Sequence, residues 1–120
     1  MPSLNKVFIM GHLGADPELK YTANDKAVCN FNVATSYGSG DNKKTEWFKV
    51  VVWEKTAEYI KEYCRKGSLV FVEGRLQTRS WGKDGDAQYI TEVIAFSAIK
   101  LDRDDQSELP LDKKEDQWDF

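Results

Sequence analysis

The sequence has few cysteines and no long apolar run, and each shortage excludes a class of protein. Cys29 and Cys64 stand alone within apolar segments and form no CxxC or Cys/His cluster, so we expect no structural zinc and a reducing environment. No apolar run approaches the roughly 18 residues of a membrane span. The first ten residues lack the layout of a signal peptide. With 41% hydrophobic and 31% charged residues over 120 positions, the chain is expected to form one globular domain with a short tail.

The chain also lacks the groupings of side chains that catalysis requires. Its single histidine, His12, has no nucleophile or pair of carboxylates fixed near it, and there is no Gly-rich phosphate loop or metal-ligand spacing. We therefore expect no enzyme, no cofactor and no metal. An enzyme is the alternative, and a nucleotide-dependent activity that vanished on mutation of His12 would support it.

An excess of charge of one sign is confined to the end of the chain. The net charge is −3, but residues 102–120 hold eight acids against three bases, so residues 1–101 are net +2. A mildly basic body suits a domain that binds a polyanion, and an acidic tail suits a separate partner-binding segment.

The body is rich in strand patterns. We expect one helix over 56–66, capped by Thr56 at its start and by a left-handed Gly67 at its end. The expected strands cover residues 4–12, 27–36, 45–53, 68–81 and 87–101. Five strands with one helix between the third and fourth is the element order of an all-β OB-fold barrel, a fold that binds oligonucleotides.

Alternation along the third strand separates an apolar face from a mixed one. Phe48, Val50 and Val52 share one parity and are the expected core, while the other parity carries two indoles, Trp47 and Trp53. Lys49 and Val51 also lie on that mixed face.

The fourth strand repeats this arrangement. Val70, Val72 and Leu76 are the expected core positions. The side chains on the opposite face include two cations and a further indole, and they are Glu73, Arg75, Gln77, Arg79 and Trp81. Indoles stack on unpaired bases for about 1–3 kcal/mol each while cations bind phosphates, whereas a duplex hides its base faces. Binding of a single strand is thus predicted; tryptophans in the core or in an oligomer interface are the alternative.

These residues belong to longer segments that resemble the single-stranded DNA-binding proteins of bacteria and phages. The resemblance extends over about residues 3–101 in the segments Asn5–Val7, Gly11–Thr22, Val33–Ser36, Thr45–Trp47, Val50–Val52, Lys66–Val70 and Val72–Trp81. It implies an OB-fold that assembles as a homotetramer and wraps single-stranded DNA in replication, recombination and repair. It also implies a cytoplasmic location, at the bacterial nucleoid or in the host cytoplasm if phage-encoded.

The resemblance assigns roles to several of the same residues. Trp47 and Trp81 match stacking positions of the family, and Trp53 stands where the family usually has a stacking Phe. Lys49, Arg75 and Arg79 lie within matched motifs and are expected to meet phosphate.

The chain also departs from the family pattern at three positions. Tyr37 lies in a shortened loop where the family often has a further stacking Trp, and we expect it to substitute for that residue. Phe48 replaces a usual His at a place tied to subunit packing. His12 stands where Asn is common, and we interpret it as a turn residue or phosphate contact.

The tail is the second expected functional element. We predict an OB-fold DNA-binding domain over 1–101 and a disordered acidic tail over 102–120, with almost no linker between the domain and the tip. Family members commonly end in an acidic tip with a final Phe, and this resemblance implies that genome-maintenance proteins bind the tip here. The expected tip residues are Glu115, Asp116, Gln117, Trp118, Asp119 and Phe120. For the tail, the alternative is a segment that only keeps the protein soluble. For the whole chain, the alternative is an OB module that binds folded RNA or a replication protein.

Overall fold

The computed structural model describes residues 2–82 and 85–102, which form six strands and one α-helix. The strands are β1 (Val7–Leu13), β2 (Glu18–Tyr21), β3 (Ala27–Tyr37), β4 (Lys44–Trp53), β5 (Leu69–Trp81) and β6 (Gln88–Lys100). The helix α1 (Glu54–Tyr63) connects β4 to β5, and a short 3-10 turn, η1 (Gly40–Asn42), lies between β3 and β4.

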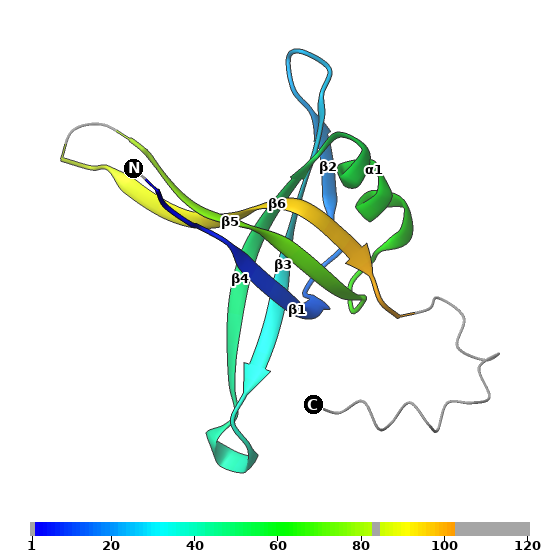
Figure 1. The fold of residues 1–120 in the computed structure, drawn as a ribbon, viewed down its shortest axis with the longest axis vertical. Helices are drawn as coiled ribbons and strands as arrows, with labels where there is room; N and C mark the ends of the chain where they lie inside the picture. Colours follow the sequence, from blue (N-terminus) through cyan, green and yellow to red (C-terminus); the bar gives the residue numbers. More distant parts are fainter. Residues whose placement is uncertain (1, 83–84, 103–120) are drawn as a thin grey trace.

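Five of the strands close into a barrel. The sheet order is β1-β5-β6-β4-β3-β2, and β1 also pairs with β3 at His12↔Ala34 and Leu13↔Val33, which joins the two sides of the sheet. β4 and β6 pair in parallel, and the other pairs are antiparallel. The β3–β4 and β5–β6 hairpins extend beyond the barrel in different directions (Figure 1). The all-β, five-stranded barrel with one helix before β5 is confirmed.

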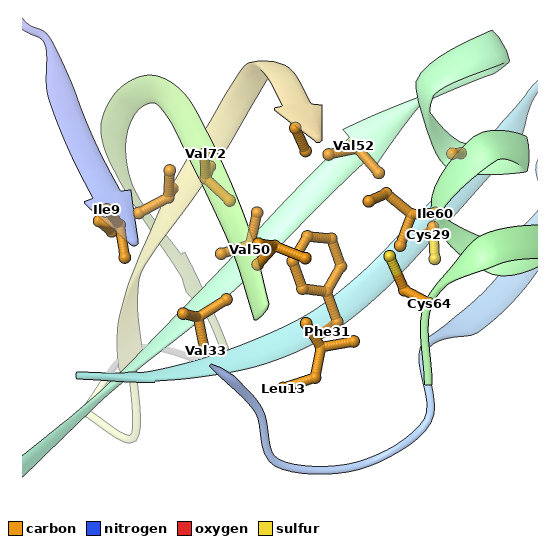
Figure 2. Close-up of a cluster of buried hydrophobic side chains, with 14 of the residues drawn as sticks. Ile9, Leu13, Cys29, Phe31, Val33, Val50, Val52, Ile60, Cys64 and Val72 are labelled. Carbon is orange, nitrogen blue, oxygen red and sulfur yellow. The ribbon is translucent and has the colours of Figure 1, made fainter. Parts of the chain in front are cut away.

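The barrel interior is filled by the apolar side chains that alternate along the inner faces of the strands (Figure 2). Phe31 and Val33 of β3 lie in this core with Val50 and Val52 of β4, and the alternation had predicted a core position for the two β4 valines. Ile60 of α1 is fully buried in the same cluster. The helix thus covers one end of the barrel, where it contacts β3 and β6.

Both cysteines are buried in this core, and no disulfide joins them. Burial raises the pKa of Cys29 to about 11, because a thiolate loses its hydration inside the barrel. Cys29 is therefore a protonated, apolar core residue at neutral pH.

The helix differs from its predicted bounds. It begins at Glu54, with no side-chain cap at its start, and ends at Tyr63; the predicted Thr56 cap and the end at residue 66 are wrong. Two backbone N–H groups beyond Tyr63 bond to residues outside the helix. The Lys66 N–H donates to Asp16 Oδ1 (2.8 Å) and the Gly67 N–H donates to the Leu13 carbonyl (2.9 Å). Gly67 has the expected positive φ of 91°, but in this separate turn.

Two further expectations about the strands are corrected. β2 was not predicted as a strand; it adds to the barrel because it pairs with β3 from Glu18↔Asn30 to Tyr21↔Ala27. Leu76 is 43% exposed and is not a core residue. Gly74 is the last β5 residue that pairs with β1, so Leu76 lies where β5 leaves the barrel and enters the hairpin arm.

The predicted tail lies outside the described residues, apart from Asp102. Among the described residues, no helix is long and apolar enough to cross a membrane.

Candidate nucleic-acid interface

The outer face of the barrel carries an open groove of about 410 Å³. The strand register places Val51 of β4 beside Ile94 of β6, and Ile94 beside Arg75 of β5, so these side chains form one row across the sheet. Val51 and Ile94 supply an apolar floor. The remaining lining residues are Asn30, Trp53, Gln77, Arg79 and Glu92. The groove brings together three predicted site residues, Trp53, Arg75 and Arg79.

Trp53 stands where β4 passes into α1. Its side chain is 41% exposed and lines the groove. The next residue, Glu54, has a φ of 56°, a left-handed conformation that is unfavourable for a residue with a side chain. This sharp junction allows Trp53 to remain on the outer face while the chain turns into the helix.

Trp47 lies on the same face of β4, six residues earlier, at a distance of roughly 20 Å for an extended strand. Its indole is 59% exposed and rests on Gly14, where an added Cβ would come within 2.7 Å of the ring carbon Cη2. Gly14 therefore leaves the space that the ring occupies. Lys49 lies between the two indoles and lines a second groove of about 210 Å³. The other residues that line this groove are Ala15, Asp16, Glu18, Asn30, Phe31 and Asn32.

Trp81 lies at the end of β5 on the hairpin arm and is 50% exposed. The Arg79 guanidinium carbon lies 5.7 Å from the centre of its ring, within the range of a cation–π contact. Arg79 in turn donates to Glu92, from Nε to Oε1 at 2.9 Å and from Nη2 to Oε2 at 3.3 Å. These bonds and the charge of Glu92 raise the pKa of Arg79 above its ordinary value.

The two arginines of the groove have different partners. Arg75 donates from Nη1 to the neutral Gln77 Oε1 at 2.8 Å, so its positive charge is not offset by that contact. The charge of Arg79 is offset by Glu92. Arg75 is consequently better suited than Arg79 to bind a phosphate, although the sequence analysis assigned both arginines the same role.

Tyr37 lies apart from these residues. It ends β3 and pairs with Lys44 in the hairpin arm that carries η1. The side chain is exposed, but it lines none of the grooves described above. The predicted tip residues, Glu115–Phe120, lie outside the described residues.

Four residues of the interface were not singled out from the sequence. Gln77 was placed on the mixed face of its strand without a role, and Asn30 was assigned no role. Glu92 and Ile94 had no usable signal, because their place in the groove depends on the pairing of β6 with both β4 and β5.

Comparison with known proteins agrees with this arrangement. The model of the single-strand binding protein family matches residues 4–101. Single-stranded DNA-binding protein 1 of Chlorobaculum tepidum is 48% identical over 98 residues, covering 76% of this chain and 60% of the relative. A single-stranded DNA-binding protein of Neisseria meningitidis is 44% identical over 99 residues, covering 78% and 57%.

Among solved structures, a Plasmodium falciparum SSB in complex with ssDNA aligns with a TM-score of 0.77 at 33% identity, covering 85% of this chain and 98% of that one. The chain spans about 60% of the length of the first curated relative and 57% of the second. On the family match and these identities, the chain belongs to the single-strand binding protein family.

Proposed function

We propose that this protein binds single-stranded DNA with little sequence preference, and that it acts as a binding protein rather than an enzyme. The observation that carries the proposal is the outer barrel face, where exposed indoles alternate with cations beside an apolar-floored groove. Every base has a face that can stack on an indole, so such a surface accepts many sequences. The likeness to a family member solved with ssDNA supports the same ligand.

In this mechanism Trp47, Trp53 and Trp81 stack on bases at separate points along the strand. Lys49 and Arg75 bind phosphates between those points, because both lie on the indole-bearing face. Stacking requires unpaired bases, so duplex DNA gains only the weaker electrostatic contacts. Protection of exposed single strands during replication, recombination and repair is the biological role we infer.

Tryptophan fluorescence tests the proposed ligand. Titration with oligo-dT should quench the emission strongly, because stacked indoles lose their fluorescence, whereas a duplex of matched length should quench weakly. A folded RNA serves as a third ligand. Equal quenching by duplex, or stronger binding of the folded RNA, would contradict the proposal in favour of another kind of OB module.

The contact between Gly14 and Trp47 gives a second test on a residue that carries no binding group itself. In Gly14→Ala the new methyl group displaces the Trp47 indole, which lies at the far end of its own side chain and can move at little cost in stability. We expect a several-fold loss of oligo-dT affinity with a nearly unchanged melting temperature. Gly40→Ala is the contrasting variant: nothing lies within 4 Å of its added Cβ, but its φ of 57° strains an alanine, so its melting temperature should fall while its oligo-dT affinity stays unchanged. Wild-type affinity in Gly14→Ala would show that the position of this indole is unimportant.

We also propose that the protein assembles as a homo-oligomer, most simply the tetramer implied by the family resemblance. Met10, Phe71 and Ile99 form an apolar row across β1, β5 and β6, and Phe8 stacks on Phe71 with ring centres 6.1 Å apart. β1 pairs with β3 only at His12 and Leu13, so most of its second edge is available to another copy. Analytical ultracentrifugation of Phe8→Ser/Met10→Ser should show a smaller species than the wild type, and an unchanged mass would overturn this interface.

The acidic tail is proposed to serve two purposes: to bind genome-maintenance proteins through residues 115–120, and to compete with DNA for the basic body. The competition rests on the charges of −5 for residues 102–120 and +2 for residues 1–101. A chain ending at Leu101 should bind oligo-dT more tightly at low salt, since the competing acids are gone. Equal affinity would refute the competition.

A further inference from the structure

We propose that Glu92 is a positioning residue that holds the Arg79 guanidinium beside the Trp81 indole and so orders this stacking site before DNA arrives. The proposal rests on the proposed function and adds a role for a residue that need not touch the DNA. Among the described residues, Glu92 is the only charged residue that is buried, with 4% of its surface exposed.

The geometry of the Glu92–Arg79 pair fixes the plane of the guanidinium. Two bonds, Nε–Oε1 at 2.9 Å and Nη2–Oε2 at 3.3 Å, join the two planar groups in the two-point geometry that only arginine offers a carboxylate. A single bond would leave the guanidinium free to rotate. The carboxylate itself is anchored in β6 opposite Gln77 of β5, so it presents a fixed point beneath the groove.

The orientation of the guanidinium is then passed to the indole. Arg79 and Trp81 are two residues apart on β5 and share a face, and the Arg79 Cζ lies 5.7 Å from the centre of the Trp81 ring. Trp81 is at the end of the strand, half exposed, on an arm that lies outside the barrel. A guanidinium against one side restricts the motion of the ring and leaves its other side for a base.

The pair also adjusts the charge of the groove. Because the Glu92 carboxylate offsets the positive charge of Arg79, Arg79 orders the Trp81 indole and does not bind a phosphate. Replacing Glu92 with Gln keeps the shape of the side chain, removes the negative charge and frees Arg79 to bind a phosphate. Each phosphate neutralised on a single strand steepens the plot of log affinity against log salt by about 0.7.

The experiment compares wild-type protein with Glu92→Gln, using oligo-dT as the probe between about 50 and 200 mM salt. We expect the affinity of Glu92→Gln to fall about 2.6-fold more than that of the wild type over this range, the value of a slope change of about 0.7. In protein that carries fluorotryptophan, the Trp81 signal, assigned with Trp81→Phe, should shift in the free Glu92→Gln protein. Glu58→Gln, which removes an exposed carboxylate on α1, should change neither quantity.

Arg79→Lys is a second variant, at an exposed side chain whose replacement does not threaten folding. It retains the charge but not the two-point geometry, so the Trp81 signal should shift and the affinity should fall several-fold. Failure of the wild type to bind oligo-dT would overturn the proposed function. Normal wild-type binding, with an unchanged Trp81 signal in Arg79→Lys or with an unchanged salt slope in a folded Glu92→Gln, would overturn the role of Glu92 alone.

Discussion

Replacing Trp47 and Trp81 together with alanine should weaken oligo-dT binding by about 2–6 kcal/mol, since each indole offers about 1–3 kcal/mol of base stacking. The two losses should add, because the indoles have separate surroundings: Trp47 rests on Gly14, and Trp81 lies beside Arg79. At roughly tenfold per 1.4 kcal/mol, the affinity falls between about 30-fold and more than 10⁴-fold. Fluorescence anisotropy of a labelled oligo-dT measures this without relying on the protein's own tryptophans.

The same titration separates stacking from general damage to the protein. Both indoles are at least half exposed, so the variant should remain folded, with a circular dichroism spectrum and melting temperature close to wild type. Tyr63→Ala removes an exposed aromatic ring from α1 instead, and its affinity should be unchanged. The salt dependence of the double variant should keep the wild-type slope, because no phosphate contact is lost. A loss of less than about 1 kcal/mol would indicate that these indoles do not stack on bases.

Strand parity predicted much of the fold because an alternating pattern reports directly on which face is buried. Val50, Val52, Val70 and Val72 all face the barrel interior as expected. The pattern failed at Leu76, where the parity continues but the barrel does not. Parity states which residues share a face; it does not state where another strand stops covering that face.

The limits of the helix were missed for a different reason. Thr56 has the chemistry of an N-cap, and Gly67 has the positive φ of a C-terminal cap. However, the tight turn at Glu54 starts the helix earlier, and Asp16 and Leu13 bind the backbone beyond Tyr63. Those two partners are about fifty residues away in sequence, so local capping rules could not include them.

The candidate site was predictable in its composition and not in its pairings. The sequence placed indoles and cations on one face, and the structure places Trp53, Arg75 and Arg79 along one groove. Which arginine has its positive charge offset by a partner depends on Glu92 and Gln77. The Glu92 contact requires the register between β5 and β6, which the parity of a single strand does not contain.

Replacing Ile60 with alanine should lower the free energy of unfolding by about 2–5 kcal/mol, the usual cost of a buried Ile-to-Ala truncation. Ile60 is fully buried and brings α1 into the core cluster with Cys29 and Val52. Truncation leaves a cavity that the strands cannot close, because β3 and β4 are held in register by their own ladder. The melting temperature should fall by at least about 8 °C, and Ile60→Val should cost only about 0.5–1.5 kcal/mol.

The same variant tests whether the barrel and the binding face are independent. Ile60 lies inside the barrel, whereas the indoles and the groove lie on its outer surface. Below its melting temperature, Ile60→Ala should therefore bind oligo-dT with wild-type affinity and salt slope. If the folded variant lost affinity, the position of α1 would itself control the interface, most directly through Trp53, which immediately precedes the helix. If α1 acts by positioning the Trp53 indole, then Trp53→Phe, which keeps an aromatic ring but not the indole at that junction, should show the same loss of oligo-dT affinity.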